Sequence, residues 1–181
     1  MTTTIAVIVG SLRKESYNRK LAQAVARLAP PDFTFKILDI SDIPLYNQDH
    51  DADPAPSVKR LKEEVAAAQG VLFVTPEYNR SIPGVLKNIL DHGSRPYGKS
   101  VWAKKPAGIL GATPGATGTA MAQQHLRNII SALDMPTLEQ PEAYITITDT
   151  FFDATGGIGE HSKAFLQKWM DSFVAWVNDC R

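Results

Sequence analysis

The sequence predicts an α/β fold in which helices cover both faces of a five-stranded parallel sheet, a three-layer, doubly wound arrangement. Apolar or β-branched runs alternate with segments of helical periodicity along the whole chain. The first, third and fourth runs are almost wholly apolar, which is typical of strands buried on both faces of a parallel sheet. With 181 residues and 44% hydrophobic content, the chain is long enough for a core of its own, and we expect one domain, 1–181.

Each predicted element rests on a pattern. The strands are Ile5–Val9, Phe33–Leu38, Val71–Thr75, Ala107–Gly111 and Tyr144–Thr148. Four helices show apolar residues three to four apart, at Leu21/Val25/Leu28, Val58/Leu61/Val65, Val85/Leu86/Ile89/Leu90 and Leu126/Ile129/Ile130/Leu133. A last helix carries a broad apolar stripe of Phe165, Leu166, Trp169, Met170, Phe173 and Val177. Pro30-Pro31 ends the first helix, Ser57 is placed to cap the second, and Ser81 with Pro83 is placed to open the third.

Right-handed crossovers between these strands favour the flavodoxin-like order 2-1-3-4-5. In that order the direction of winding changes between the first and third strands. Ligands of such sheets bind where the winding changes, outside the carboxyl ends of the strands. We therefore expect a ligand to lie across the loops that follow Val9 and Thr75.

The first of these loops has the composition of a phosphate site. The segment Gly10–Asn18 reads GSLRKESYN and leads from a buried strand into a helix. Free N–H groups and the positive end of a helix favour an anion, and the guanidinium of Arg13 adds a bidentate donor. An ordinary polar turn, capped by Ser16 or Asn18, is the alternative interpretation.

Two further loops follow neighbouring strands. After the third strand, residues 75–84 supply a planar aromatic (Tyr78), an amide (Asn79), a cation (Arg80) and several backbone N–H groups, which suit a flat heterocycle with polar edges. After the fourth strand, residues 111–118 are mostly small, which allows a ring to approach the backbone closely. A turn with a surface tyrosine and a flexible connector are the alternatives for these two loops.

Composition excludes several classes of protein. Nineteen basic and nineteen acidic side chains cancel, whereas a nucleic-acid binder normally has a basic surplus. The single Cys180 excludes an intrachain disulfide and a thiolate metal cluster. Residues 1–4 lead into the first strand without a signal-peptide pattern, and no apolar run approaches the roughly 20 residues of a membrane span. We expect a cytoplasmic protein with no membrane insertion, no nucleic-acid partner and no metal.

The chain resembles the NAD(P)H-dependent FMN reductases, in particular the flavodoxin-like quinone and chromate reductase branch. The matching strings are GSLRKESYN, TPEYNRSIPGVLKNILDHGSRPYGKSVWAKKPAGILGATPG, HLRNIISALD and PEAYI, and the similarity runs from Ile5 to about Ile147. The first two strings together are specific to the family. One departure is Gly118-Thr119, where relatives often have two glycines.

The resemblance implies FMN as cofactor, NADPH or NADH as electron donor, and a role for each loop. The FMN phosphate would be held by Ser11, Arg13, Ser16, Tyr17 and Asn18. The isoalloxazine would be lined, chiefly through main-chain groups, by Pro76, Glu77, Tyr78, Asn79 and Arg80. The other side of the ring would be bordered by Thr113, Pro114 and Gly115. Family members are usually dimers or tetramers, so the resemblance also implies a homodimer or homotetramer.

We expect a ping-pong cycle in which NAD(P)H passes a hydride to the flavin and leaves before a small-molecule acceptor binds. Quinones, chromate, azo dyes, nitroaromatics and free flavin all fit that acceptor. No side chain is required as nucleophile or general base, so no catalytic residue is nominated. The serious alternative is a non-enzymatic FMN protein, either an electron carrier or a regulatory module; an interaction module without flavin is a third reading.

Other motifs match known site patterns but do not predict the corresponding function. Residues 93–100 match the Walker A pattern, but the sequence predicts a helix before them and a strand after them, the reverse of what a phosphate loop needs. We expect this segment to carry Arg95, Tyr97 and Trp102 toward a subunit interface or the rim of the flavin pocket. Asp91-His92 and Glu160-His161 lack further partners, no GxSxG elbow is present, and the third strand does not end in the Asp of a receiver domain.

Overall fold

Five parallel strands form one sheet in the order β2-β1-β3-β4-β5, as predicted. The structure, a computed structural model, describes residues 2–180; Met1 and Arg181 of the expected 1–181 domain lie outside the described residues. The strands are β1 (Thr3–Val9), β2 (Phe33–Ile37), β3 (Gly70–Val74), β4 (Ala107–Thr113) and β5 (Tyr144–Thr146). The helices are α1 (Tyr17–Ala26), α2 (Pro56–Ala67), α3 (Gly84–Gly93), α4 (Ala120–Ala132) and α5 (Glu160–Asp179), with a 3-10 turn, η1 (Gln48–His50). The fold is flavodoxin-like.

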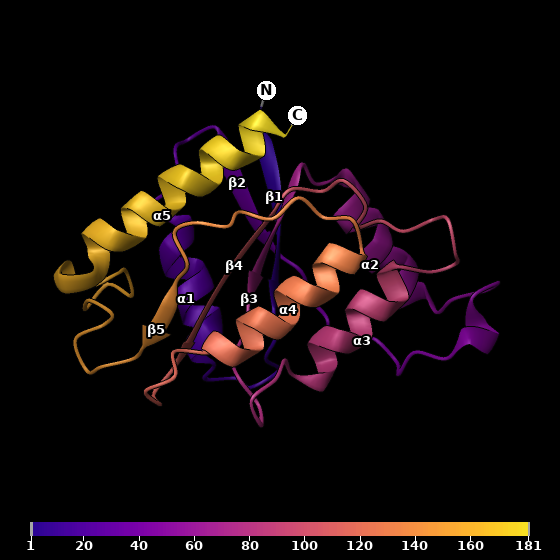
Figure 1. Ribbon diagram of the computed structural model, residues 1–181, viewed down its shortest axis with the longest axis horizontal. Helices are drawn as coiled ribbons and strands as arrows, with labels where there is room; N and C mark the ends of the chain where they lie inside the picture. Colours follow the sequence, from indigo (N-terminus) through magenta and orange to yellow (C-terminus); the bar gives the residue numbers. More distant parts are fainter. Residues whose placement is uncertain (1, 181) are drawn as a thin grey trace.

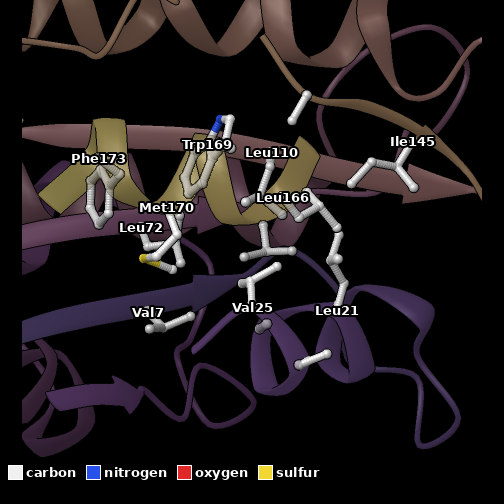
Figure 2. Close-up of a cluster of buried hydrophobic side chains, with 14 of the residues drawn as sticks. Val7, Leu21, Val25, Leu72, Leu110, Ile145, Leu166, Trp169, Met170 and Phe173 are labelled. Carbon is white, nitrogen blue, oxygen red and sulfur yellow. The ribbon is translucent and has the colours of Figure 1, made fainter. Parts of the chain in front are cut away.

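Helices α1 and α5 cover one face of the sheet (Figure 1). Side chains of a parallel strand alternate between faces, so Val7 points toward these two helices while its neighbours Ala6 and Ile8 point the other way. Figure 2 shows the resulting core, in which residues of α1 and α5 meet residues of β1, β3, β4 and β5. The labelled members are Val7, Leu21, Val25, Leu72, Leu110, Ile145, Leu166, Trp169, Met170 and Phe173.

Helices α2, α3 and α4 cover the opposite face, where a second core forms around Phe73 of β3. Trp102 belongs to this core, and our expectation that it points to an interface or pocket rim is wrong. Its side chain is fully buried, its Nε1 donates to the carbonyl of Leu90 at 3.0 Å, and its ring lies 6.1 Å from that of Phe73. Burial of the large indole, with its one donor satisfied, outweighs any gain from display on the surface.

Two helix starts differ from the sequence interpretation. Helix α2 begins at Pro56 with Ala55 as its N-cap, and Ser57 lies inside the helix, where its hydroxyl donates to the carbonyl of Asp42. Helix α3 begins at Gly84 directly after Pro83, without a side-chain cap, and Ser81 belongs to the preceding turn. In both cases proline opens the helix and tertiary contacts take the hydroxyl.

Strand β4 is longer than predicted because it has two partners in succession. Up to Leu110 it pairs with β3, and from Gly111 to Thr113 it pairs with β5. The Walker-like segment follows α3 and precedes β4, which confirms the reversed order predicted for it. None of the helices within residues 2–180 is long and apolar enough to cross a membrane.

Candidate functional site

The loops that follow β1, β3 and β4 converge on a cleft of about 150 Å³ at the carboxyl edge of the sheet. It is lined by Ser11, Arg13, Ser16, Tyr17, Asn18, Pro76, Glu77, Tyr78, Ala112, Thr113 and Pro114. The structure therefore brings together all the predicted site residues except Asn79, Arg80 and Gly115. Asn79 and Gly115 directly follow lining residues, and Arg80 follows Asn79. Ala112 is added.

The first loop presents unpaired donors at the start of α1. Ser16 is the N-cap: its Oγ accepts from the N–H of Arg19 at 3.2 Å, which satisfies one of the four free donors of the helix. The N–H groups of Tyr17 and Asn18 face no acceptor among the described residues. The capping role considered for Ser16 is thus real, and it leaves donors over for an anion.

Arg13 stands at the mouth of this turn. Its guanidinium lies over the ring of Tyr17, with Cζ 5.6 Å from the ring centroid. The backbone N–H of Arg13 donates to Ser11 Oγ at 3.4 Å. Nearby, a hydrogen bond and the charge of Lys20 lower the pKa of Glu15. Lys20 pairs with that carboxylate at 2.9 Å, and Arg13 forms no ion pair of its own within residues 2–180, so its guanidinium stays available for a ligand.

Asn18 is placed at the site but its side chain is already engaged. It is 3% exposed, its Nδ2 donates to the carbonyl of Ala112 at 2.9 Å, and its Oδ1 accepts from the N–H of Ala112 at 2.9 Å. The group that it offers to a phosphate is therefore its backbone N–H.

The second loop ends in a tight hairpin. Tyr78 and Ser81 exchange two backbone hydrogen bonds of 3.0 Å each, and the two residues between them, Asn79 and Arg80, have φ of 51° and 63°. Positive φ at both central positions is the signature of a type I′ turn, a shape that favours Asn followed by Gly. The N–H groups of Asn79 and Arg80 form no backbone hydrogen bond within residues 2–180, so they remain donors at the tip of the loop.

Glu77 has a role that sequence reasoning missed. Its Oε2 accepts from the N–H groups of Met121 and Ala122, both at 3.1 Å, and its Oε1 accepts from the hydroxyl of Thr117 at 3.5 Å. It therefore caps α4 from another loop, at the positive end of the helix dipole. No signal in the sequence indicated this role, because Thr119 is of a residue type that caps helices and only the structure shows that its side chain does not cap α4.

Thr119 has a left-handed backbone conformation, with φ of 67°, of the kind that glycine adopts without strain. The hydroxyl of this buried residue accepts from Nε2 of Gln123 at 3.0 Å. The turn is kept compact by Gly118 as well, because a Cβ there would come within 2.7 Å of the backbone of Tyr144. These contacts hold the end of the third loop at the start of α4.

These features suit a mononucleotide with a flat ring. Free N–H groups and Arg13 offer donors for a phosphate at one end of the cleft. Tyr78, whose side chain is 52% exposed, and the donor tip of the hairpin suit a polar planar ring at the other end. The sheet order and these loops are those of a flavodoxin-like nucleotide-binding protein.

Comparison with known proteins specifies the family. The profile of the NADPH-dependent FMN reductases matches residues 3–149. The chain is 51% identical over 182 residues to a 2-hydroxy-1,4-benzoquinone reductase of a Burkholderia species, with 100% of both chains covered. It is 42% identical over 176 residues to an NAD(P)H-dependent FMN reductase of Pseudomonas aeruginosa, covering 96% of this chain and 95% of the relative.

Among solved structures, the flavoenzyme NAD(P)H:(acceptor) oxidoreductase FerB from Paracoccus denitrificans superposes with a TM-score of 0.94 and 42% identity, covering 98% of each chain. The chain belongs to the NADPH-dependent FMN reductase family. It is an oxidoreductase that uses FMN and NAD(P)H.

Proposed function

We propose that this enzyme reduces quinones, or acceptors of similar chemistry such as chromate, azo and nitro compounds or free flavin, by a ping-pong hydride mechanism. Bound FMN would supply the redox chemistry between a nicotinamide donor, NADPH or NADH, and the acceptor. The observation that carries the proposal is the convergence of unpaired backbone donors and Arg13 on one cleft. The names of relatives, which include quinone reductases of Burkholderia and Pseudomonas putida, support the choice of acceptor.

The chain's own residues would bind and orient the cofactor. The phosphate would be held by the first loop, through Ser11, Arg13, Ser16, Tyr17 and the backbone of Asn18. The ring would lie between the second and third loops, against Pro76, Glu77, Tyr78, Asn79 and Arg80 on one side and Thr113, Pro114 and Gly115 on the other.

The hairpin tip would supply electrostatic stabilisation. Backbone N–H groups aimed at a position where negative charge develops act as an oxyanion hole, and they need no reorganisation. The N–H groups of Asn79 and Arg80 are held ready by the two hydrogen bonds between Tyr78 and Ser81. No side chain of the cleft is required to accept or donate a proton.

Steady-state kinetics test the reaction order. With NADPH or NADH varied at several fixed concentrations of benzoquinone, a ping-pong enzyme gives parallel double-reciprocal lines, whereas intersecting lines would exclude that mechanism. An electron carrier would show negligible turnover without a partner reductase. Rates over a panel of quinone, chromate, azo, nitro and flavin acceptors would then rank the substrates by kcat/KM.

The phosphate site is tested by replacing Arg13 with alanine. Loss of one charge-assisted hydrogen bond is worth about 1.5–3 kcal/mol, so the Kd for FMN should rise roughly 10- to 150-fold. Lys14→Ala is the matched control, since Lys14 is an exposed neighbour that does not line the cleft. Equal FMN affinity in both variants would remove Arg13 from the site.

We propose that the working unit is a homodimer or homotetramer. Tyr78 is 52% exposed and Leu12 is 51% exposed, so two large apolar side chains flank the cleft without cover from this chain. Association of subunits over the cleft would bury them. Sedimentation equilibrium at micromolar concentration decides the matter: a purely monomeric protein would contradict the proposal.

A further inference from the structure

The sheet has a break at the edge of the cleft, and Asn18 fills it. The ladder between β3 and β4 ends where the N–H of Thr75 donates to the carbonyl of Leu110 at 3.0 Å. Alternate residues of a strand direct their N–H and C=O groups to the same side, so those of Ala112 also point toward β3. Beyond Thr75, however, no described residue of the second loop forms a backbone hydrogen bond to Ala112.

The side-chain amide of Asn18 takes the place of the missing strand. It offers one donor and one acceptor, as a peptide group does, and it satisfies both backbone groups of Ala112 at 2.9 Å. Both residues are buried, at 3% and 1% exposure, so water has little access to replace these bonds. Residues 18 and 112 are 94 positions apart in the sequence.

We propose that Asn18 is a positioning residue that sets the distance between the phosphate end and the ring end of the cofactor cleft. The residue lies in the first turn of α1, where the free N–H groups are, and Ala112 directly precedes Thr113 and Pro114 of the third loop. The two hydrogen bonds between Asn18 and Ala112, which we call the clamp, therefore fasten the phosphate-binding turn to the loop that borders the ring. The inference rests on the proposed function, in which FMN spans both ends.

Comparing the binding of FMN with that of riboflavin distinguishes this positioning role from a direct contact between the Asn18 side chain and the phosphate. Riboflavin has the ring of FMN but no phosphate. If Asn18 positions the third loop, Asn18→Ala should raise the Kd for riboflavin at least tenfold, and the Kd for FMN by at least the same factor, because FMN also depends on the distance between the two ends. Quenching of flavin fluorescence measures both. Alanine is chosen because it adds no charge beside the phosphate site, and Arg13→Ala is the comparison variant, expected to weaken FMN alone.

A loss of FMN affinity in Asn18→Ala with riboflavin affinity unchanged would overturn the proposal, because it would indicate that the Asn18 side chain contacts the phosphate directly. A variant that binds both flavins like the wild type would overturn it as well.

If Asn18→Ala does not fold, measurements on the wild-type protein can test the proposal instead. In a 15N spectrum of the flavin-free protein, we expect the side-chain amide protons of Asn18 to exchange slowly with solvent. On titration with inorganic phosphate, the backbone amides of Tyr17 and Asn18 should shift while the side-chain amide of Asn18 does not. Fast exchange of that side-chain amide, or a shift as large as that of the backbone, would refute the clamp.

The outcomes also distinguish this inference from the proposed function. A wild-type protein that binds no FMN while the Asn18 amide stays protected would refute the flavin function and leave the clamp as a purely structural bond. A wild-type protein that binds FMN, with riboflavin binding insensitive to Asn18→Ala, would refute the clamp alone.

Discussion

Replacing Glu77 with alanine should destabilise the protein through a helix that Glu77 does not belong to. The carboxylate accepts from two N–H groups at the start of α4, those of Met121 and Ala122, at 3.1 Å each. No other side chain within residues 2–180 caps α4: the hydroxyl of Thr119, its N-cap residue, accepts from the side chain of Gln123 and from no backbone N–H of the helix. Removal of the carboxylate therefore leaves two N–H groups without their acceptor.

The magnitude follows from these contacts. Loss of an N-terminal cap costs about 0.5–2 kcal/mol, and loss of a negative charge at the positive end of the dipole costs roughly 0.3–1 kcal/mol. Glu77 is only partly buried, so we take a value near the middle, about 1.5 kcal/mol, for Glu77→Ala. For a chain of this length, that corresponds to a melting temperature lowered by roughly 3–6 °C.

The assay is urea denaturation and thermal melting of the flavin-free protein, so that cofactor binding does not enter. Glu77→Gln keeps an oxygen acceptor without the charge and should lose only part of the stability. Glu63→Ala on α2 removes an exposed glutamate that forms no ion pair or side-chain hydrogen bond within residues 2–180, and it should leave the free energy of unfolding nearly unchanged. If Glu77→Ala unfolds at the same urea concentration and temperature as Glu63→Ala, the cap contributes nothing and the reasoning fails.

Three further predictions concern the backbone and one turn. Arg80→Gly should stabilise the flavin-free protein by about 0.5–1 kcal/mol, because Arg80 holds a left-handed φ of 63° that glycine adopts without strain; a lower free energy of unfolding in urea would contradict this. Gly93→Ala should destabilise the protein by about 1–3 kcal/mol, because the new Cβ would lie 2.4 Å from Nε1 of Trp102. Alanine is the better helix former, so a raised melting temperature would show that the indole moves aside without cost. Asp153→Asn should lose stability at neutral pH, because hydrogen bonds, first of all from the Thr155 hydroxyl, hold the pKa of Asp153 below its ordinary value. A lowered folded-state pKa gives stability that is full above the unfolded pKa of about 4 and vanishes as the pH falls through the folded pKa. Melting temperatures of wild type and variant should therefore converge as the solution is acidified, and a difference that does not shrink in acid would contradict this role of the carboxylate.

The site was predictable at the level of loops and less so at the level of side chains. Strand order alone places the loops after β1 and β3 side by side, and the composition of residues 10–18 indicates a phosphate turn. The roles of Asn18 and Glu77 were not predictable in this way. Each side chain forms hydrogen bonds to backbone groups far away in the sequence, at Ala112 and at Met121. The residues next to Asn18 and Glu77 in the sequence do not indicate such distant partners.

The position of Trp102 in the core was likewise not predictable from local sequence. In the sequence it lies in a polar segment rich in turn residues, which favours display on the surface. In the folded chain it inserts against Phe73, and Gly93 leaves room for its ring.

The order of strands, the two covered faces of the sheet and the position of the cleft were determined by the sequence, because alternating apolar periods and right-handed crossovers admit few arrangements. Tertiary structure alone decided which polar side chains face the ligand and which complete the protein's own hydrogen bonds. The physical reason is that a buried N–H or C=O must find a partner wherever the chain happens to end or turn. At the end of β3 that partner is Asn18, and at the start of α4 it is Glu77.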